Sequence, residues 1–225
     1  MTAHLLTGAG SGIGAVLAER LLARGDDLVL LARSAERAAE LSTTYAGATV
    51  LVADLADPES LEGLELPASL DSVVHAAGVV DLGAVAELST EAWRSQLEVN
   101  LLAPAVLTRL ALPALRAARG TVVFVNSGAG LRANPGWSAY AASKFGLRAL
   151  ADALRLEEKE HGVRVTTVHP GRTATPMQEK VHAQEGAPYD AQDWIQAGTV
   201  VDVVLHALDL PRDATVPDVT VSPGP

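Results

Sequence analysis

The chain has no cysteine among its 225 residues. This absence excludes disulfides, thiolate metal sites and a cysteine nucleophile. No run of apolar residues reaches the roughly 18 positions that a membrane span needs. The amino-terminal stretch AHLLTGAG becomes apolar without a basic region before it and shows no cleavage-site pattern, so we expect no signal peptide. Together these absences favour a cytoplasmic protein that has no membrane partner.

Basic residues are also scarce, with 17 Lys and Arg against 27 Asp and Glu, which gives a formal net charge of −10. An acidic chain without a basic stripe is a poor binder of nucleic acid, so we expect no such partner. The sequence points to no metal site, internal repeat or linker. Its length fits a single domain over residues 1–225.

Short apolar runs alternate with helical patterns along the chain, which indicates an α/β fold. Six such runs are predicted to be strands: 3–7, 27–31, 48–53, 71–75, 121–126 and 163–169. A seventh run at 215–222 suits an edge strand because it contains Pro217. This order predicts a Rossmann-type, doubly wound parallel sheet of about seven strands with helices on both faces.

The longest helical patterns lie after residue 88. Ser89 is predicted to cap a long helix that bends at Pro104 and Pro113, and further helices are predicted over 137–161 and 191–209. The segment 176–190 is polar and poorly periodic. We expect a mobile loop with a short helix there, a candidate substrate lid.

A glycine-rich turn follows the first predicted strand and precedes a helix. Its glycines are Gly8, Gly12 and Gly14, with Ser11 as a possible N-cap. Glycine lets the backbone approach a pyrophosphate, and a helix N-terminus offers unpaired N–H groups. An ordinary tight turn is the alternative, but the strand–turn–helix context favours a dinucleotide site.

Arg33 follows the second predicted strand, where a dinucleotide fold faces the adenosine ribose. An acidic residue there binds the 2′-hydroxyl, whereas an arginine accepts a 2′-phosphate. Asp26 and Asp27 come too early in the strand for the first role. Arg33 therefore favours NADP(H), with NAD(H) still possible; a solvated arginine at a helix start is the alternative.

Tyr140 and Lys144 are four residues apart in a predicted helix, so their side chains share one face. A cation favours the phenolate, so we expect Lys144 to lower the pKa of Tyr140 from about 10 toward neutrality. Ser127 follows the fifth predicted strand, and the intervening loop returns the Tyr140 helix beside it. A chance pair on an amphipathic helix is the alternative.

Two other polar residues are less clear from the sequence. Asn100 lies near the expected helix break, and a structural asparagine is as plausible there as a functional one. His75 ends the fourth predicted strand, and we interpret it as structural rather than catalytic. The small residues Ala76, Ala77 and Gly78 that follow it let a ligand lie close to the backbone.

These motifs resemble, in order and spacing, those of the short-chain dehydrogenase/reductase family over essentially the whole chain. They are Thr7-Gly8-x-x-x-Gly12-Ile13-Gly14, Ala76-Ala77-Gly78, Asn100, Ser127, Tyr140-x-x-x-Lys144 and Pro170-Gly171. The resemblance implies a catalytic tetrad of Asn100, Ser127, Tyr140 and Lys144. Tyr140 is then the acid or base, and Ser127 holds the substrate oxygen. Lys144 binds the nicotinamide ribose and lowers the Tyr140 pKa, while Asn100 holds a water that relays protons to Lys144.

The resemblance also implies contacts with the cofactor. Asp54 and Leu55 are expected beside the adenine, and Thr173 and Thr175 beside the nicotinamide carboxamide. The residues assigned to the cofactor are Gly8, Ser11, Gly12, Ile13, Gly14, Arg33, Asp54, Leu55, Ala76, Ala77, Gly78, Tyr140, Lys144, Pro170, Gly171, Thr173 and Thr175.

Three positions depart from the family pattern. His75-Ala76 stands where Asn-Asn is frequent, and Thr173 stands where Val or Ile is usual. Ser11 stands where many NADP-using members have a basic residue, which leaves Arg33 as the only clear ligand for a 2′-phosphate.

The sequence thus predicts an NAD(P)-dependent oxidoreductase acting on a ketone or secondary alcohol. Its pocket is expected to be largely apolar and lined by Ser127, Ala129, Trp137, Tyr140 and parts of 176–190. Helices around 90–117 and 137–161 are expected to form a homodimer or homotetramer. The alternatives are a nucleotide-binding sensor, disfavoured because all four tetrad positions are filled, and a nicotinamide-dependent epimerase or dehydratase, whose C-terminal substrate domain is usually larger.

Overall fold

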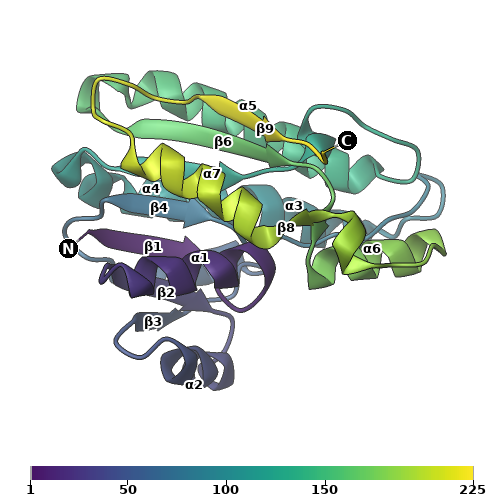
Figure 1. Ribbon diagram of the computed structural model, residues 1–225, viewed down its shortest axis with the longest axis horizontal. Helices are drawn as coiled ribbons and strands as arrows, with labels where there is room; N and C mark the ends of the chain where they lie inside the picture. Colours follow the sequence, from purple (N-terminus) through teal and green to yellow (C-terminus); the bar gives the residue numbers. More distant parts are fainter. Residues whose placement is uncertain (1, 225) are drawn as a thin grey trace.

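A computed structural model describes residues 2–224 and contains a seven-stranded sheet in which every pairing is parallel. The strand order is β3-β2-β1-β4-β5-β6-β9 (Figure 1). The bounds are Ala3–Thr7 (β1), Asp27–Ala32 (β2), Thr49–Val52 (β3), Ser72–His75 (β4), Thr121–Val125 (β5), Arg164–Pro170 (β6) and Asp218–Val221 (β9). The predicted fold class is confirmed, and β9 is the edge strand.

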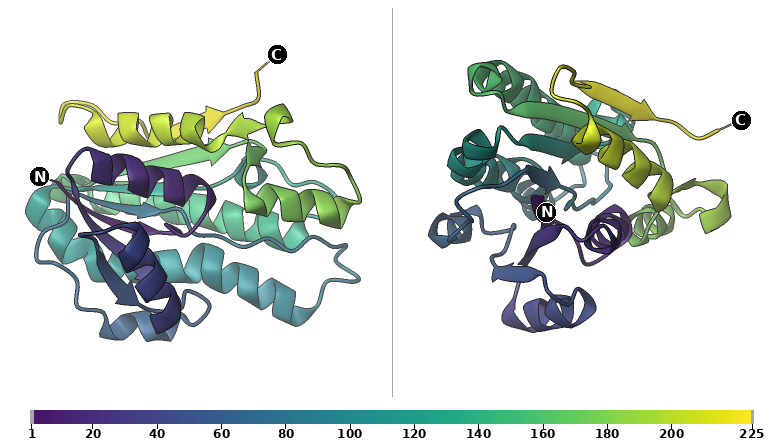
Figure 2. Two further views of the ribbon diagram at one scale, coloured as in Figure 1. Left: turned by 60° about the horizontal axis from the view of Figure 1, so that its bottom comes forward. Right: turned by 60° about the vertical axis from the view of Figure 1, so that its left-hand side comes forward.

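Helices cover both faces of the sheet (Figure 2). They are α1 (Gly12–Ala23), α2 (Ala35–Thr44), α3 (Thr90–Leu97), α4 (Ala103–Ala118), α5 (Ser138–Glu157), α6 (Pro176–Glu185) and α7 (Ala197–Asp209). Residues of α4 and α5 enter one core cluster, whereas residues of α1, α2 and α7 enter the other.

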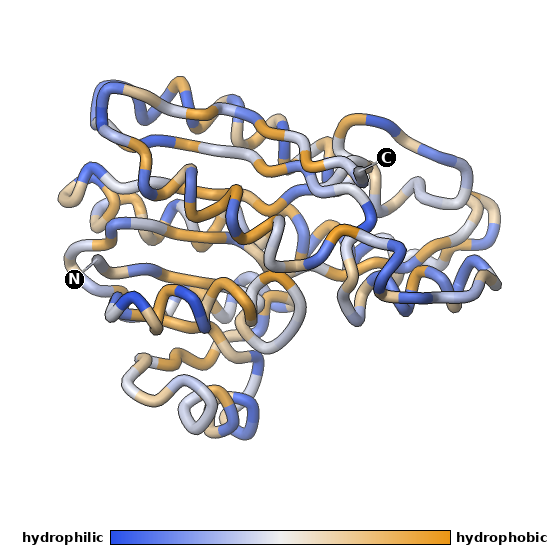
Figure 3. Tube along the Cα trace, in the orientation of Figure 1, coloured by the Kyte–Doolittle hydropathy of each residue, from blue (hydrophilic) through white to orange (hydrophobic). Residues whose placement is uncertain are grey.

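The alternation of side chains along each strand explains the two cores. Leu5 and Val73 face the α4–α5 side, and their neighbours Leu6 and Val74 face the α1–α7 side. Successive strand residues point to opposite faces, so a strand covered on both faces is apolar throughout. The central strands are accordingly coloured mainly as hydrophobic in Figure 3.

The long helical stretch is interrupted where the sequence predicts a break. A π-helical turn, η2 (Glu98–Leu102), separates α3 from α4. Pro104 has no N–H to offer the Asn100 carbonyl four residues earlier, so the regular α-helical bond cannot form there. The expected break at Pro113 is absent, because this proline lies inside continuous α4.

The stretch Thr90–Ala118 is long and apolar enough to cross a membrane by length and composition alone. In the fold its α4 residues Leu107, Ala111 and Leu115 are buried against the sheet. The core of a soluble protein passes the same test, so this stretch is weak evidence for a membrane span.

The predicted bounds of two helices are wrong, and one pair of short strands was not predicted. The helix predicted over 191–209 begins only at Ala197, after a 3-10 turn (Ala191–Asp193) and a two-residue strand, β8 (Ile195–Gln196). Strand β8 pairs with β7 (Thr173–Ala174), which no pattern in the sequence indicates. The helix predicted over 137–161 ends as α5 at Glu157, before a separate 3-10 turn (Lys159–His161), and a 3-10 helix, η1 (Pro58–Gly63), follows Asp57.

All carboxyl ends of the seven strands meet at one edge because the strands are parallel. The register pairs Thr7 with His75, and His75 with Phe124. The loops that follow β1, β4, β5 and β6 therefore lie next to one another, at the end of the sheet where α6 lies (Figure 1).

Candidate active site

Two neighbouring cavities lie at this edge of the sheet. A groove of about 820 Å³ runs past the glycine turn and the ends of β2, β3 and β4. A second pocket of about 500 Å³ lies beyond the end of β5 and beside α5 and α6. Ile13 and Met177 line both, so the two cavities lie next to each other.

The glycine turn brings backbone very close to backbone. Gly8 has a φ of +79°, and a Cβ placed on it would lie 2.7 Å from the Ala77 nitrogen. A Cβ on Gly14 would collide with the Gly8 carbonyl. The Ser11 side chain makes no capping hydrogen bond to α1. The first N–H groups of α1 therefore have no side-chain cap from Ser11, as suits a site for an anion.

Alanine substitutions at two glycines distinguish the steric effect of this close backbone approach from the conformational cost of a positive φ. Gly8→Ala and Gly25→Ala both place alanine at φ near +79° and +78°, but nothing lies within 4 Å of a Cβ on Gly25. We expect Gly25→Ala to cost roughly 1 kcal/mol of stability. Gly8→Ala should cost several kcal/mol more through overpacking and also weaken dinucleotide binding at least tenfold. Urea unfolding and a cofactor titration measure both effects, and equal results for the two variants would contradict this account.

Two arginines line the groove where β2 ends and α2 begins. Arg33 and Arg37 both line it, together with the predicted adenine neighbours Asp54 and Leu55. Arg37 pairs with Glu40 and donates to the Gly10 carbonyl at 2.9 Å. Within residues 2–224, the Arg33 side chain makes no hydrogen bond or ion pair, so its charge is available to a ligand in the groove.

Asn100 and Lys144 are buried behind the cavities and line neither of them. Asn100 is 1% exposed; it accepts from the Val79 N–H at 2.8 Å and donates to the Val79 carbonyl at 2.9 Å and to Ser143 Oγ at 3.0 Å. Lys144 Nζ donates to the Val125 carbonyl at 3.2 Å. Both side chains reach Gly78, since a Cβ there would lie 3.2 Å from Asn100 Oδ1 and 3.7 Å from Lys144 Nζ.

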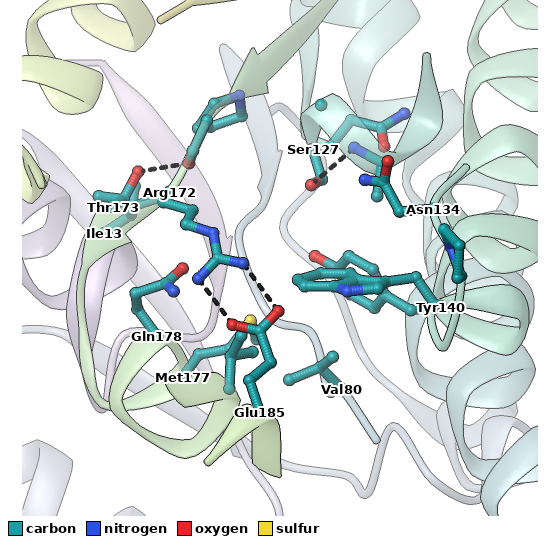
Figure 4. A pocket seen from close by; sticks show the side chains of 18 residues that line it. Ile13, Val80, Ser127, Asn134, Tyr140, Arg172, Thr173, Met177, Gln178 and Glu185 are labelled. Atoms are coloured by element: carbon teal, nitrogen blue, oxygen red, sulfur yellow. Dashed lines mark hydrogen bonds and ion pairs between the residues drawn. The ribbon is translucent and has the colours of Figure 1, made fainter. Parts of the chain in front are cut away.

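Ser127 and Tyr140 line the second pocket, on its side formed by the β5 end and α5 (Figure 4). The Ser127 hydroxyl accepts from the Ala129 N–H at 3.1 Å. Trp137 packs edge-on against the Tyr140 ring, with centroids 5.8 Å apart. Ala129 and Trp137 also line this pocket, so the four residues predicted to contact substrate lie around one cavity.

The expected lowering of the Tyr140 pKa is wrong for this structure. Burial raises the pKa of the Tyr140 phenol, and the hydrogen bond from Ser127 opposes the rise only in part. Lys144 Nζ lies 5.8 Å from the centroid of the tyrosine ring, and burial lowers the pKa of Lys144 itself to about 8. Removal from water disfavours both the phenolate and the ammonium, and it is the largest cause of both pKa shifts.

The opposite wall of the pocket combines polar groups with the apolar Met177 and Val181, so the prediction of a largely apolar pocket holds only in part. Arg172 forms two hydrogen bonds with Glu185, at 2.8 and 2.7 Å. Gln178 and Thr173 lie beside them, across the cavity from Ser127 and Tyr140 (Figure 4). The segment 176–190 therefore contributes a charged group as well as Met177 and Val181.

His75 lies among core side chains. It stacks on Phe124 with centroids 4.9 Å apart and bonds to Thr108 Oγ1 at 2.8 Å. Burial lowers the pKa of His75 to about 3, so the ring is neutral at pH 7. These contacts agree with a structural role at the end of β4.

The structure gathers most of the predicted residues around the two cavities. Gly8, Ser11, Gly12, Ile13, Arg33, Asp54, Leu55, Ala76, Ala77, Gly78 and Thr175 line the groove, and Ile13, Ser127, Ala129, Trp137, Tyr140, Pro170, Gly171 and Thr173 line the pocket. Gly14 packs under the turn, and Asn100 and Lys144 lie behind the walls.

The sequence reasoning missed four polar residues near the site. Ser143, one residue before Lys144, bridges Asn100 and the Tyr140 carbonyl, and Asn126 Nδ2 donates to the Lys144 carbonyl at 3.1 Å. Arg37 lies one helical turn after Ser34, and Arg172 directly follows Pro170-Gly171. All four lie close in the sequence to residues that were predicted for the site, and this closeness was the signal that could have identified them.

The fold and cavities define a dinucleotide-binding α/β protein with a pocket at the carboxyl ends of its strands. The family model for short chain dehydrogenases matches residues 2–186, and the chain belongs to this family.

The curated relatives include Dehydrogenase/reductase SDR family member 7B of Bos taurus, which is 33% identical over 84% of this chain and 63% of that protein. The chain therefore spans less than two thirds of that relative's length.

Two solved structures are also similar. The alcohol dehydrogenase of Thermococcus sibiricus, complexed with 5-hydroxy-NADP, is 27% identical with a TM-score of 0.82, over 98% of this chain and 96% of that one. A short-chain dehydrogenase of Sphingobium yanoikuyae in complex with NADPH is 29% identical with a TM-score of 0.80. The match covers 97% of this chain and 87% of that one.

Proposed function

We propose that the protein is an NADP(H)-preferring oxidoreductase that interconverts a ketone and a secondary alcohol. One observation carries the proposal: the hydroxyl residues Ser127 and Tyr140 line a pocket that adjoins a groove built on a glycine turn and shares Ile13 and Met177 with it. Oxidation of NADPH that depends on an added ketone, followed by nicotinamide absorbance, tests it.

The residues of the groove suit a dinucleotide. The close backbone approach at Gly8 leaves no room for a side chain, the N-terminus of α1 favours a pyrophosphate, and unpaired Arg33 suits a 2′-phosphate. Asp54 and Leu55 would flank the adenine, and Thr173 and Thr175 would lie toward the nicotinamide. When bound, NADP(H) supplies or accepts the hydride.

The chain's own residues then handle the oxygen and its proton. In reduction, negative charge develops on the carbonyl oxygen, and the Ser127 and Tyr140 hydroxyls donate hydrogen bonds to it. Tyr140 gives up its proton as the alcohol forms, and its raised pKa keeps this proton in place until then. In oxidation the same group accepts the proton.

Lys144 and Asn100 support this transfer from behind the wall. The Lys144 ammonium would bind the ribose hydroxyls past Gly78, where there is no side chain, and would supply positive charge as the phenolate forms. Pro104 leaves the Asn100 carbonyl without its α-helical donor, so this oxygen is suited to holding a water that relays protons to Lys144.

Arg33→Asp should reverse the cofactor preference. The new carboxylate repels a 2′-phosphate and accepts from a 2′-hydroxyl, so KM for NADP(H) should rise at least tenfold and KM for NAD(H) should fall. Arg132→Asp makes the same charge change at an exposed residue that lines neither cavity. A wild-type protein that already prefers NAD(H) would refute the role given to Arg33.

We also propose that α6 and the loop after it, over 176–190, form a substrate lid on a single domain. Met177, Gln178, Val181 and Glu185 of this segment line the pocket, and the residues from 183 to 188 are exposed. A lid of this kind excludes water from the reacting oxygen when it closes.

A homodimer or homotetramer is the expected assembly, and the cytoplasm remains the expected location. Leu97, Leu102 and Phe145 are exposed on the helical layer of α3, η2 and α5. A second copy of the chain would bury them. We expect Phe145→Asp to shift the sedimentation coefficient toward monomer, whereas Val85→Asp, at a residue 70% exposed outside this layer, should not. A monomeric wild type would contradict the assembly.

A further inference from the structure

The guanidinium of Arg172 is held in place by side chains from separate parts of the chain. Its central carbon lies 5.9 Å from the Trp137 ring and 5.5 Å from the Trp194 ring. Trp137 directly precedes α5, and Trp194 directly precedes β8. Aromatic faces attract a guanidinium and shield it from water, so they fix its orientation before any ligand arrives.

The exposed edge of this guanidinium already holds a carboxylate. Glu185 accepts from both terminal nitrogens, at 2.8 and 2.7 Å, in the two-point geometry that arginine forms with carboxylates. The edge is therefore shaped and oriented for a planar anion. It faces the cavity that also contains Ser127 and Tyr140 (Figure 4).

Glu185 is the more easily displaced partner of the pair. It is the last residue of α6 and is followed by Gly186, which has a φ of +66° and begins an exposed loop. Within residues 2–224, its side chain bonds only to Arg172. An ion pair with one partner on a surface segment contributes little net stability, so an incoming carboxylate can replace it.

We infer that Arg172 is a specificity-determining residue that binds a carboxylate of the substrate, with Glu185 occupying that position until the substrate displaces it. The substrate class is then an oxo acid and the corresponding hydroxy acid, with the reacting oxygen at Tyr140 and the carboxylate at Arg172. Arg172 and Glu185 are the only charged residues lining this pocket in the described chain. Withdrawal of Glu185 therefore leaves it with a single positive charge. The inference rests on the proposed oxidoreductase activity of the same site.

A series of straight-chain oxo acids, from 2-oxo to 6-oxo, and their methyl esters tests the inference with NADPH. Each ester keeps the reacting ketone and loses the charge. For the best acid we expect wild-type kcat/KM to exceed that of its ester roughly tenfold to 100-fold, the range of a charge-assisted hydrogen bond. Arg172→Met should remove this preference, so that the ratio of kcat/KM for the acid to that for its ester falls to near one. Glu185→Gln should raise kcat/KM for the acid relative to that for its ester.

Lys180→Met is the matched control for loosening of α6. Lys180 ties α6 to the Val80 carbonyl at 2.7 Å and to Asp81 at 2.6 Å but does not line the pocket. Its loss should change acid and ester equally. If Arg172→Met also changes them equally, Arg172 only fastens α6 and the inference is wrong.

The turnover measured with the wild-type protein distinguishes failure of this inference from failure of the proposed function. Equal turnover of acids and esters, or turnover of esters alone, overturns the role of Arg172 while the oxidoreductase stands. Lack of turnover with every acid, ester and simple ketone overturns the proposed function, and the inference falls with it.

Discussion

Replacement of Tyr140 by phenylalanine should lower kcat by at least about 10³-fold while the affinity for NADP(H) stays within about threefold. The substitution removes the only group in the pocket that is proposed to exchange a proton with the substrate oxygen. Loss of a general acid costs typically 10²- to 10⁴-fold, and loss of one donor to a developing oxyanion costs a similar factor. The ring itself remains, so packing against Trp137 is kept.

Tyr45→Phe is the matched control because it also removes a buried hydroxyl. The Tyr45 hydroxyl donates to the Ala9 carbonyl in the glycine turn at 2.9 Å and lines neither cavity. This variant should weaken cofactor binding modestly and leave kcat almost unchanged. A Tyr140→Phe protein that retains substantial kcat would refute the acid/base role.

Lys144→Met should have opposite effects on activity and stability. Activity should fall at least 10³-fold, because the ribose contact and the positive charge near Tyr140 are lost. The free energy of unfolding at pH 7 should nevertheless rise by about 2 kcal/mol, because burial of the ammonium in the wild type is costly.

The expected rise in the free energy of unfolding follows from the pKa of Lys144, which burial lowers from 10.5 to about 8. The unfolded chain binds this proton more tightly, so the wild type gains stability as the pH rises from about 8 to 10.5. At pH 7 the lowered pKa costs about 3 kcal/mol. The Lys144→Met variant also loses the hydrogen bond to the Val125 carbonyl, which reduces the expected gain in stability by about 1 kcal/mol.

Urea unfolding at several pH values measures this effect. We expect the stability difference between Lys144→Met and wild type to shrink between pH 8 and 10.5. Lys180→Met serves as the control, since Lys180 is about half exposed and pairs with Asp81, and it should not be stabilising. A less stable Lys144→Met protein at pH 7 would contradict the account.

Much of the fold is readable from the sequence because its strands are buried on both faces. Residues such as Leu5 and Leu6, or Val73 and Val74, alternate between two cores, so the strands in the middle of the sheet are mainly apolar. The short pair β7–β8 could not be predicted in this way. Each strand has two residues, and their pairing depends on the tertiary approach of Thr173 to Ile195.

The candidate site was predictable to the extent that its residues fall at strand ends and on one helix face. The environment of each residue was not. The spacing of Tyr140 and Lys144 correctly predicts a shared helix face, yet the direction of the Tyr140 pKa shift depends on burial by loops distant in sequence. Likewise, Arg172 becomes a pocket residue only because Trp137, Trp194 and Glu185 converge on it.

The most direct test of the proposed hydride transfer is a screen of ketones, oxo acids and secondary alcohols with NADPH, NADH and their oxidised forms. Nicotinamide absorbance would be followed for wild type and Tyr140→Phe side by side. We predict that at least one carbonyl compound drives oxidation of NADPH by the wild type, and that Tyr140→Phe binds NADPH without turnover. Binding of NADPH with no turnover of any compound by the wild type would contradict the account and favour a nucleotide-binding sensor.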